Sequence, residues 1–273
     1  MQFIKKKVLI IYRLFKKTGL LEKSWVKKLF LFSYFLYKKY FEDPFFGLIK
    51  KSPEIFKGGN ILDIGANIGY TSILFSKAVT PGFNVYAFEP DRANFITLKE
   101  IIKTRKARGI IIPIHAALGA KNGTVELWHN ENHHGDHRIL TQKYKKSGVD
   151  LSKVYVVPMW CIDSFVESET ANSAVKFIKI DVQGYELPVC LGMQQTLAAN
   201  PDAVVALEYA PSSMSELGFA PEEVLKLFQD KGYFMYILHK RGKLEPAQNK
   251  VIDKLVKKRG YIDLVFSRKE LIP

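Results

Sequence analysis

The chain has 273 residues and a formal net charge of +14 at pH 7, and 47% of its residues are hydrophobic. This length and apolar content support one large domain or two small ones and exclude disorder as the main state. With only two cysteines, Cys161 and Cys190, the chain is not a disulfide scaffold, and a reducing, cytoplasmic setting fits best.

Most of the net charge lies in residues 1–41. They hold eleven Lys or Arg residues and a single acid, Glu22, so they carry +10. Large apolar side chains interleave with the lysines, which predicts two helices separated at Gly19. These helices either pack on the main domain, lie on an anionic membrane surface or contact RNA. No apolar run is long enough for a bilayer span or a secretory signal core.

From residue 60 onward, short apolar runs alternate with helical segments, which predicts a parallel sheet covered by helices on both faces. We expect strands at 60–64, 84–88, 110–114, 175–180, 203–208, 233–239 and 261–267, and helices at 70–78, 93–103, 186–198 and 221–230. The predicted fold class is α/β, with a seven-stranded, mostly parallel sheet. Residues 1–57 form a basic, aromatic-rich helical extension, and residues 58–273 form the main domain.

An insertion separates the third and fourth parallel strands. Its segments 124–128 and 154–159 alternate in polarity, which predicts an inserted β-hairpin over the ligand edge of the sheet. The polar loop from Asn130 to Asp150 is long for a compact domain, which predicts a functional role for it.

A glycine-bearing turn follows the first strand, with the sequence Asp63-Ile64-Gly65-Ala66-Asn67-Ile68-Gly69-Tyr70-Thr71. Glycines allow positive φ and let a ligand approach the main chain. Glu89 closes the second strand and can accept hydrogen bonds from both hydroxyls of a ribose. Asp63 suits a cationic amino group, so the pattern favours S-adenosylmethionine over NAD. An ordinary strand-to-helix turn is the alternative.

Two further segments are informative together with this turn. They are Ala87-Phe88-Glu89-Pro90 and Ile178-Lys179-Ile180-Asp181-Val182-Gln183-Gly184-Tyr185-Glu186. Together the three resemble the FkbM family of S-adenosylmethionine-dependent methyltransferases over residues 58–267. The resemblance implies a class I, Rossmann-like methyltransferase fold and O-methylation of a sugar or another small natural product. The expected cofactor contacts are Asp63, Gly65, Asn67, Gly69, Tyr70, Thr71, Glu89 and Ala117. Gln183 departs from the Glu that the family usually has.

Methyl transfer to a hydroxyl calls for a general base near the acceptor. Asp181 closes the fourth strand at the ligand edge, and the resemblance makes it the leading catalytic residue. Glu186 either works with Asp181 or caps the next helix. Glu208, at the end of the fifth strand, faces the same edge and is expected to bind the substrate.

Four of the six histidines lie between residues 129 and 137, at the start of the polar loop of the insertion. We expect His134 and His137 to act as catalytic bases, and His133, Asp136 and Arg138 to bind the substrate. A solvated loop and a metal site are the alternatives, and the resemblance does not require a metal.

The sequence therefore predicts an O-methyltransferase for a sugar, glycolipid or other small-molecule or glycan acceptor. It is expected to be cytoplasmic and to contact an anionic membrane surface through residues 1–41. One alternative is an RNA methyltransferase, although the chain lacks an Asn/Asp-Pro-Pro-Tyr motif, which makes nucleic acid the less favoured partner. The other is a non-catalytic, membrane-associated binding module, which Gln183 leaves open.

Overall fold

The computed structural model describes residues 24–107, 110–130, 137–170 and 174–272. The chain divides into two compact units, Met1–Asp43 and Pro44–Pro273. In the first unit, α2 (Ser24–Tyr37) continues into a short π-helix at Lys38–Glu42. None of the helices in the described ranges is long and apolar enough to cross a membrane.

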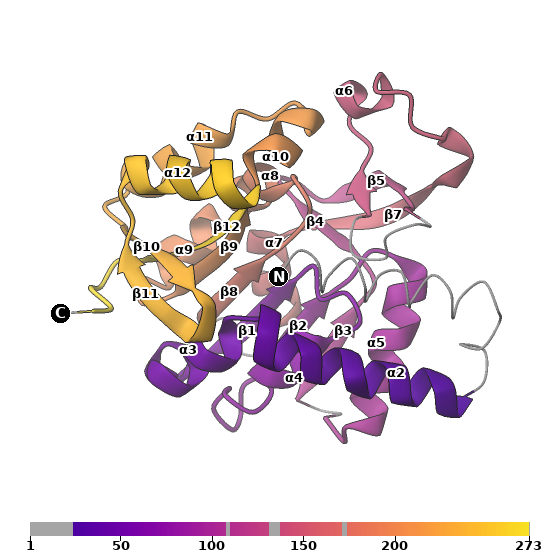
Figure 1. Cartoon of the computed structure of the whole chain (residues 1–273), viewed down its shortest axis with the longest axis horizontal. Coiled ribbons are helices and arrows are strands. Elements are labelled where there is room, and N and C mark those ends of the chain that lie inside the picture. The colour runs from indigo at the N-terminus through magenta and orange to yellow at the C-terminus, as the bar shows by residue number, and fades with distance from the viewer. Residues whose placement is uncertain (1–23, 108–109, 131–136, 171–173, 273) are drawn as a thin grey trace. The chain divides into compact units, whose positions relative to one another are not determined.

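An eight-stranded sheet forms the centre of the second unit, in the order β11-β10-β12-β9-β8-β1-β2-β3 (Figure 1). The strands are β1 (Asn60–Ile64), β2 (Val85–Phe88), β3 (Ile111–Ile114), β8 (Val175–Ile180), β9 (Val204–Tyr209), β10 (Phe234–His239), β11 (Lys243–Pro246) and β12 (Ile262–Ser267). The pairs from β3 to β9 are parallel, whereas β12 runs antiparallel to both of its neighbours. All seven expected strands are present. The expected count was one too low, because the short β11 pairs with β10 at the edge of the sheet.

The strand order places a switch in topology between β1 and β8. From β1 the chain moves outward through β2 to β3, and it then returns to place β8 on the other side of β1. In open α/β sheets, ligands bind outside the carboxyl ends of the strands at such a switch. The ends of β1, β2 and β8 are therefore where a ligand is expected.

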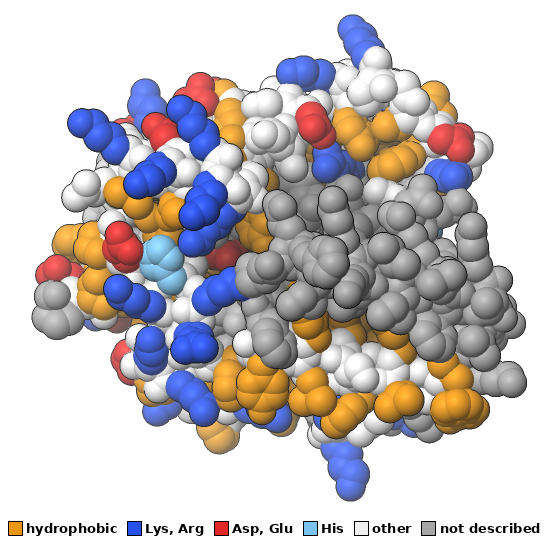
Figure 2. All heavy atoms as spheres, viewed as in Figure 1, with side chains coloured by type: hydrophobic (Ala, Val, Ile, Leu, Met, Phe, Trp, Pro, Cys, Tyr) orange, Lys and Arg blue, Asp and Glu red, His pale blue; other side chains and the backbone are white. Residues whose placement is uncertain are grey.

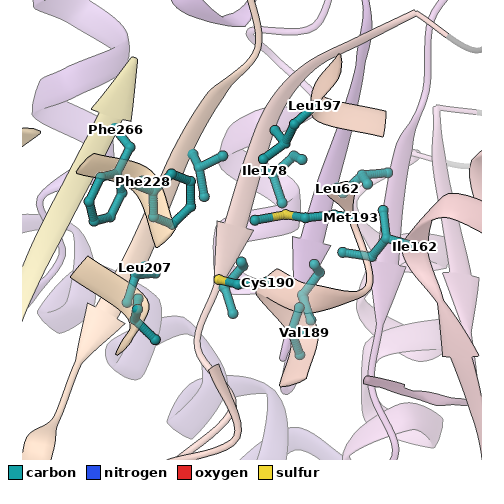
Figure 3. Packing of buried hydrophobic residues seen from close by; sticks show 14 of the residues in the cluster. Leu62, Ile162, Ile178, Val189, Cys190, Met193, Leu197, Leu207, Phe228 and Phe266 are labelled. Carbon is teal, nitrogen blue, oxygen red and sulfur yellow. The ribbon is translucent and has the colours of Figure 1, made fainter. Parts of the chain in front are cut away.

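Helices cover both faces of the sheet because side chains alternate between the faces along each strand. One face packs against α7 (Ile162–Glu169), α8 (Glu186–Leu191), α9 (Gln194–Ala199), α11 (Pro221–Gln229) and α12 (Asn249–Arg259). Figure 3 shows this core, in which Leu62 and Ile178 of the strands lie beside Met193. The helices α3 (Phe45–Lys51), α4 (Tyr70–Phe75) and α5 (Arg92–Thr104) and a 3-10 turn at Pro53–Phe56 belong to the other side, and α10 (Pro211–Leu217) follows β9.

The second unit begins at Pro44, ahead of the boundary at residue 57 that the sequence suggested. Phe45 and Phe56 are buried, and their rings lie 5.6 Å from Phe75 and 4.4 Å from Phe177, measured between centroids. These contacts tie the segment to α4 and β8. Sequence reasoning placed it with the N-terminal extension because the alternation of short apolar runs and helical segments begins only at residue 60.

A second, smaller sheet is built from the insertion between β3 and β8, in the order β4-β7-β5-β6. Its strands are β4 (Ala117–Gly119), β5 (Gly123–Trp128), β6 (Arg138–Ile139) and β7 (Val154–Cys161), and α6 (Gln142–Lys145) and a 3-10 turn at Leu151–Lys153 lie in the connections. β5 and β7 pair antiparallel from Gly123 opposite Met159 to Trp128 opposite Val154, so the predicted hairpin is confirmed. β4 and β6 extend it into a sheet.

Candidate active site

A pocket lies at the carboxyl ends of β1, β2 and β8. Among the residues that line it are Gly65, Asn67, Glu89, Asn94, Ala117, His137, Asp181, Gln183 and Tyr185. Six of the residues predicted from the sequence are thus brought together: four expected cofactor contacts, and the expected catalytic residues Asp181 and His137. They come from five separate segments, which only the sheet topology places side by side.

The turn after β1 forms one wall of the pocket. Gly65 has a φ of +75°, and a Cβ at this position would lie 1.8 Å from the carbonyl oxygen of Asp181. Asn67 also has positive φ, and its Oδ1 accepts the N–H of Ile68 at 2.8 Å. Glycine is required at residue 65 because the turn passes directly against the end of β8.

Glu89 is buried at the end of β2. Its Oε2 accepts the N–H of Asn67 at 2.8 Å, and its Oε1 accepts the N–H of Asp91 at 2.9 Å. Burial raises the pKa of Glu89 to about 7, although these two hydrogen bonds oppose the shift. Because a carboxylate has four lone-pair sites, two fixed oxygens can still accept further hydrogen bonds from a hydroxylated ligand.

Asp63 lies behind the pocket wall, and none of its surface is exposed. Its Oδ2 accepts hydrogen bonds from the hydroxyls of Thr71, at 2.7 Å, and Ser72, at 2.6 Å. The sequence analysis expected Asp63 to meet a cationic amino group, but here its carboxylate supports the start of α4. Gly69, Tyr70 and Thr71 are likewise absent from the residues that line the pocket.

Lys179 connects the two strands at the centre of the site, and sequence reasoning missed it. Its Nζ donates to the carbonyl oxygens of Gly65, at 2.9 Å, and Ile64, at 3.3 Å. The same atom lies 3.5 Å from Oδ1 of Asp63 and 3.5 Å from Oδ2 of Asp181. Although burial opposes the charge, the neighbouring carboxylates raise the pKa of Lys179. The available signal was a lysine between two buried isoleucines, Ile178 and Ile180.

Gln183 lies between two of the predicted site carboxylates. Its Nε2 donates to Oδ1 of Asp181 at 2.8 Å and to Oε1 of Glu208 at 3.3 Å. Burial, followed by the charge of Asp181, raises the pKa of Glu208 well above its usual range. An amide therefore supplies a donor where a glutamate would add a further negative charge.

Glu186 holds the loop that follows β8. It is fully buried at the start of α8, and its Oε1 accepts the N–H groups of Val182 and Gly184, both at 3.2 Å. Burial raises the pKa of Glu186 to about 7. Of the two roles that the sequence left open, these contacts favour support of the backbone over direct chemistry.

A buried carboxylate, Asp91, gathers the two histidines that flank the polar loop. Its Oδ2 accepts hydrogen bonds from Nδ1 of His129, at 2.7 Å, and from the hydroxyl of Tyr155, at 2.6 Å. The ring of His137 stacks on that of His129 with centroids 4.5 Å apart. Sequence reasoning missed Asp91, His129 and Tyr155 because they lie in three separate segments: after β2, after β5 and within β7.

The N–H of Asn130 donates to Nδ1 of His137 at 3.0 Å. Since Nδ1 accepts, the neutral ring carries its proton on Nε2, which lies 3.7 Å from Oδ2 of Asp91. The expected role of His137 as a base stays a prediction. Ligand-type atoms of Asp91, His129 and His137 lie within 4.8 Å of one another. A metal ion would need a deprotonated Nε2, which this hydrogen bond disfavours.

The other predicted catalytic and substrate residues of the polar loop either do not line the pocket or fall outside the described ranges. Arg138 pairs with Glu216 and packs over the ring of Tyr144. His133, His134 and Asp136 fall within 131–136, outside the described residues.

Residues 63–235 match the methyltransferase FkbM domain. The chain belongs to the FkbM methyltransferase family. This confirms the resemblance seen in the motifs, and the FkbM domain has the expected class I, Rossmann-like arrangement of a mostly parallel sheet between helices.

The hexuronic acid methyltransferase AglP of Haloferax volcanii is 27% identical over 170 residues, which are 62% of this chain and 60% of AglP. The chain thus spans well under two thirds of the length of this curated relative. Two solved structures are also similar. A methyltransferase FkbM from Methylobacillus flagellatus is 17% identical with a TM-score of 0.48, over 83% of this chain and 46% of that chain. The O-methyltransferase TomG from Streptomyces achromogenes was solved with S-adenosylmethionine. It is 10% identical with a TM-score of 0.47, over 83% of this chain and 80% of TomG.

S-adenosylmethionine is the methyl donor of FkbM-family methyltransferases, and the pocket of this FkbM domain fits that molecule. Glu89 would hold the ribose hydroxyls, since it is a buried carboxylate at the end of β2 that lines the pocket. The turn of Gly65 and Asn67 would hold the donor close to its main chain, where no side chain intervenes at Gly65.

Proposed function

We propose that this protein is an S-adenosylmethionine-dependent O-methyltransferase that methylates a hydroxyl group of a sugar, glycolipid or other small natural product. The observation that carries the proposal is the meeting of Glu89 and Asp181 in one pocket of an FkbM domain. One carboxylate suits the ribose of the donor, and the other suits the hydroxyl of the acceptor.

When bound, the donor supplies an electrophilic methyl group. The chain has to hold the acceptor hydroxyl in line with that group and to receive its proton. Asp181 is placed for the second task because it lines the pocket and its side chain is 35% exposed. Lys179 and Gln183 hold one oxygen each, which orients the carboxylate toward an acceptor.

His137 lines the pocket beside Asp91. The N–H of Asn130 donates to its Nδ1, so the proton of the neutral ring sits on Nε2, which is buried and lies 3.7 Å from Oδ2 of Asp91. This arrangement fixes the ring in the wall of the pocket, while Asp181 takes the proton of the acceptor.

A sugar acceptor is favoured by the relative from Haloferax volcanii, which is named for hexuronic acid. Hydroxyl-rich acceptors also suit a pocket edge that carries Asp181 and Gln183, because carboxylates and amides hydrogen-bond sugar hydroxyls well. We therefore place hexuronic acids and their glycosides first among the acceptors.

The first experiment is a calorimetric titration of the full chain with S-adenosylmethionine. Glu89→Gln is expected to weaken binding at least about tenfold, because it removes the charge that two ribose hydroxyls share. Glu167→Gln, on the exposed surface of α7, is the matched control and should bind like the wild type. A folded wild-type chain that does not bind S-adenosylmethionine would overturn the proposed function.

The same titration has a predicted pH dependence. With a pKa of about 7, Glu89 is protonated in acid and must lose its proton to accept both hydroxyls. Binding of the donor should therefore strengthen roughly tenfold from pH 6 to pH 8 and release a proton. Glu89→Gln should remove this dependence.

Acceptors are then compared by the formation of S-adenosylhomocysteine. Turnover is expected with methyl glycosides of hexuronic acids or hexoses, and Asp181→Asn should reduce kcat by about 100-fold, the lower range for a general base. Turnover only with RNA would replace this proposal by the RNA alternative. Donor binding with no turnover on any of these acceptors would favour a binding module.

A further inference from the structure

An apolar stripe runs along α2 and into the π-helix that follows it. It consists of Trp25, Leu29, Phe32, Leu36 and Tyr40, which are between 41% and 67% exposed. The first four follow the spacing i, i+4, i+7 and i+11, so they share one face of the helix. Figure 2 shows apolar side chains in a row over α2.

This exposure is the reverse of the usual arrangement of a surface helix. Only Ser24, Lys27, Lys28 and Ser33 interrupt the apolar sequence of α2. A helix of a water-soluble protein normally turns its large apolar residues toward the core, and a contiguous exposed patch marks an interaction site. The stripe therefore calls for a partner with an apolar surface.

The positive charge of residues 1–41 indicates the chemical nature of that partner. Residues 1–41 carry eleven Lys or Arg residues against Glu22, and Lys38 and Lys39 directly follow α2. Positive charge beside an apolar face complements a bilayer with anionic headgroups, because each lysine near the surface is attracted to them. RNA would satisfy the lysines, but it offers no apolar surface to Leu29 and Leu36.

The described length of α2 is that of a helix lying in the bilayer interface. Its fourteen residues extend about 21 Å, against a hydrocarbon core of about 30 Å. Trp25 and Tyr40 mark the two ends of the stripe, and these residue types are enriched where the bilayer meets water. The helix can therefore lie flat, with its stripe among the acyl chains.

We propose that the apolar stripe of α2 binds the chain to a bilayer that contains anionic lipids. The helix lies in the interfacial plane, and the lysines of the segment contact the headgroups. This inference does not rest on methyl transfer, so failure of either proposal leaves the other intact.

The test is co-sedimentation of the full chain with phosphatidylcholine vesicles, with and without phosphatidylglycerol. Binding is expected only with phosphatidylglycerol and should weaken as salt is raised, because salt screens the lysines. The double variant Trp25→Glu/Phe32→Glu should reduce partitioning at least about tenfold, since it places charge among acyl chains.

A matched control places two glutamates at exposed apolar positions outside the stripe. Ile96 and Leu151 are also exposed, at 49% and 57%, but belong to the α/β unit. Ile96→Glu/Leu151→Glu should partition like the wild type, and both double variants should keep the wild-type melting temperature. Equal loss in both variants, equal binding to pure phosphatidylcholine, or no binding would overturn the proposal. So would a dimer or an RNA complex that forms through the stripe while vesicles are not bound.

Discussion

Lys179 links the end of β8 to the turn after β1. It binds the carbonyl oxygens of the β1 turn and faces the carboxylates of Asp63 and Asp181. A buried ammonium group costs desolvation energy, and it is retained here because two carbonyls and two carboxylates surround it. The charge of Lys179 thus helps to shape the pocket and, together with Gln183, to orient Asp181.

Replacing Lys179 by Met should lower the free energy of unfolding by about 3–5 kcal/mol, because Asp63 is left as an uncompensated buried charge. Urea denaturation of the variant and the wild type measures this difference in the free energy of unfolding. Lys179→Met/Asp63→Asn should recover part of the loss, since it removes that charge. If the single variant were as stable as the wild type, the ammonium would not hold the site together.

At the level of elements, the insertion sheet is tied to α5 by a few buried polar contacts. Asp91 caps the start of α5 through the N–H of Asn94 and accepts the hydroxyl of Tyr155 from β7. Although burial opposes ionisation, these hydrogen bonds hold the pKa of Asp91 below its usual value. The second sheet is thereby fastened where it borders the pocket.

Tyr155→Phe should cost about 1.5–3 kcal/mol at pH 7, the range for a hydrogen bond to a charged group. The cost should shrink as the pH falls toward about 3, because a carboxyl whose pKa is lowered in the fold loses its stabilising effect when it is protonated. Urea denaturation of the variant and the wild type at both pH values measures this cost. The control is Val156→Ala on the same strand, where the side chain is 65% exposed and little change is expected. A cost that is the same at both pH values would contradict the role given to Asp91.

Element boundaries also follow from close packing. The sequence predicts one helix over 186–198, but the structure ends α8 at Leu191 and begins α9 at Gln194. A Cβ at Gly192 would lie 2.2 Å from the carbonyl oxygen of Gly119 in β4. The break occurs where the chain meets the second sheet, and a local propensity cannot show such a contact.

For the whole molecule, the independent folding unit is expected to begin at Pro44. A chain of residues 44–273 should keep a cooperative thermal transition, because it retains Phe45, Leu48 and Phe56 in the core. A chain of residues 58–273 loses all three, and burial of a large aromatic side chain alone contributes about 3–5 kcal/mol. It should melt at least about 10 °C lower or fail to fold. Calorimetry of the two truncated chains compares them, and equal melting temperatures would favour the boundary at residue 57.

The sequence alone determined the strands, the glycine turn and the family, because these depend on local periodicity and on contiguous motifs. Gly65 and Glu89 were found this way. The tertiary structure decided which residues meet. It turned Asp63 and Glu186 inward as supports, and it assembled Lys179, Asp91 and His129 around the pocket from separate strands. The reason is that burial and charge pairing depend on contacts between segments far apart in the chain, which no single motif records.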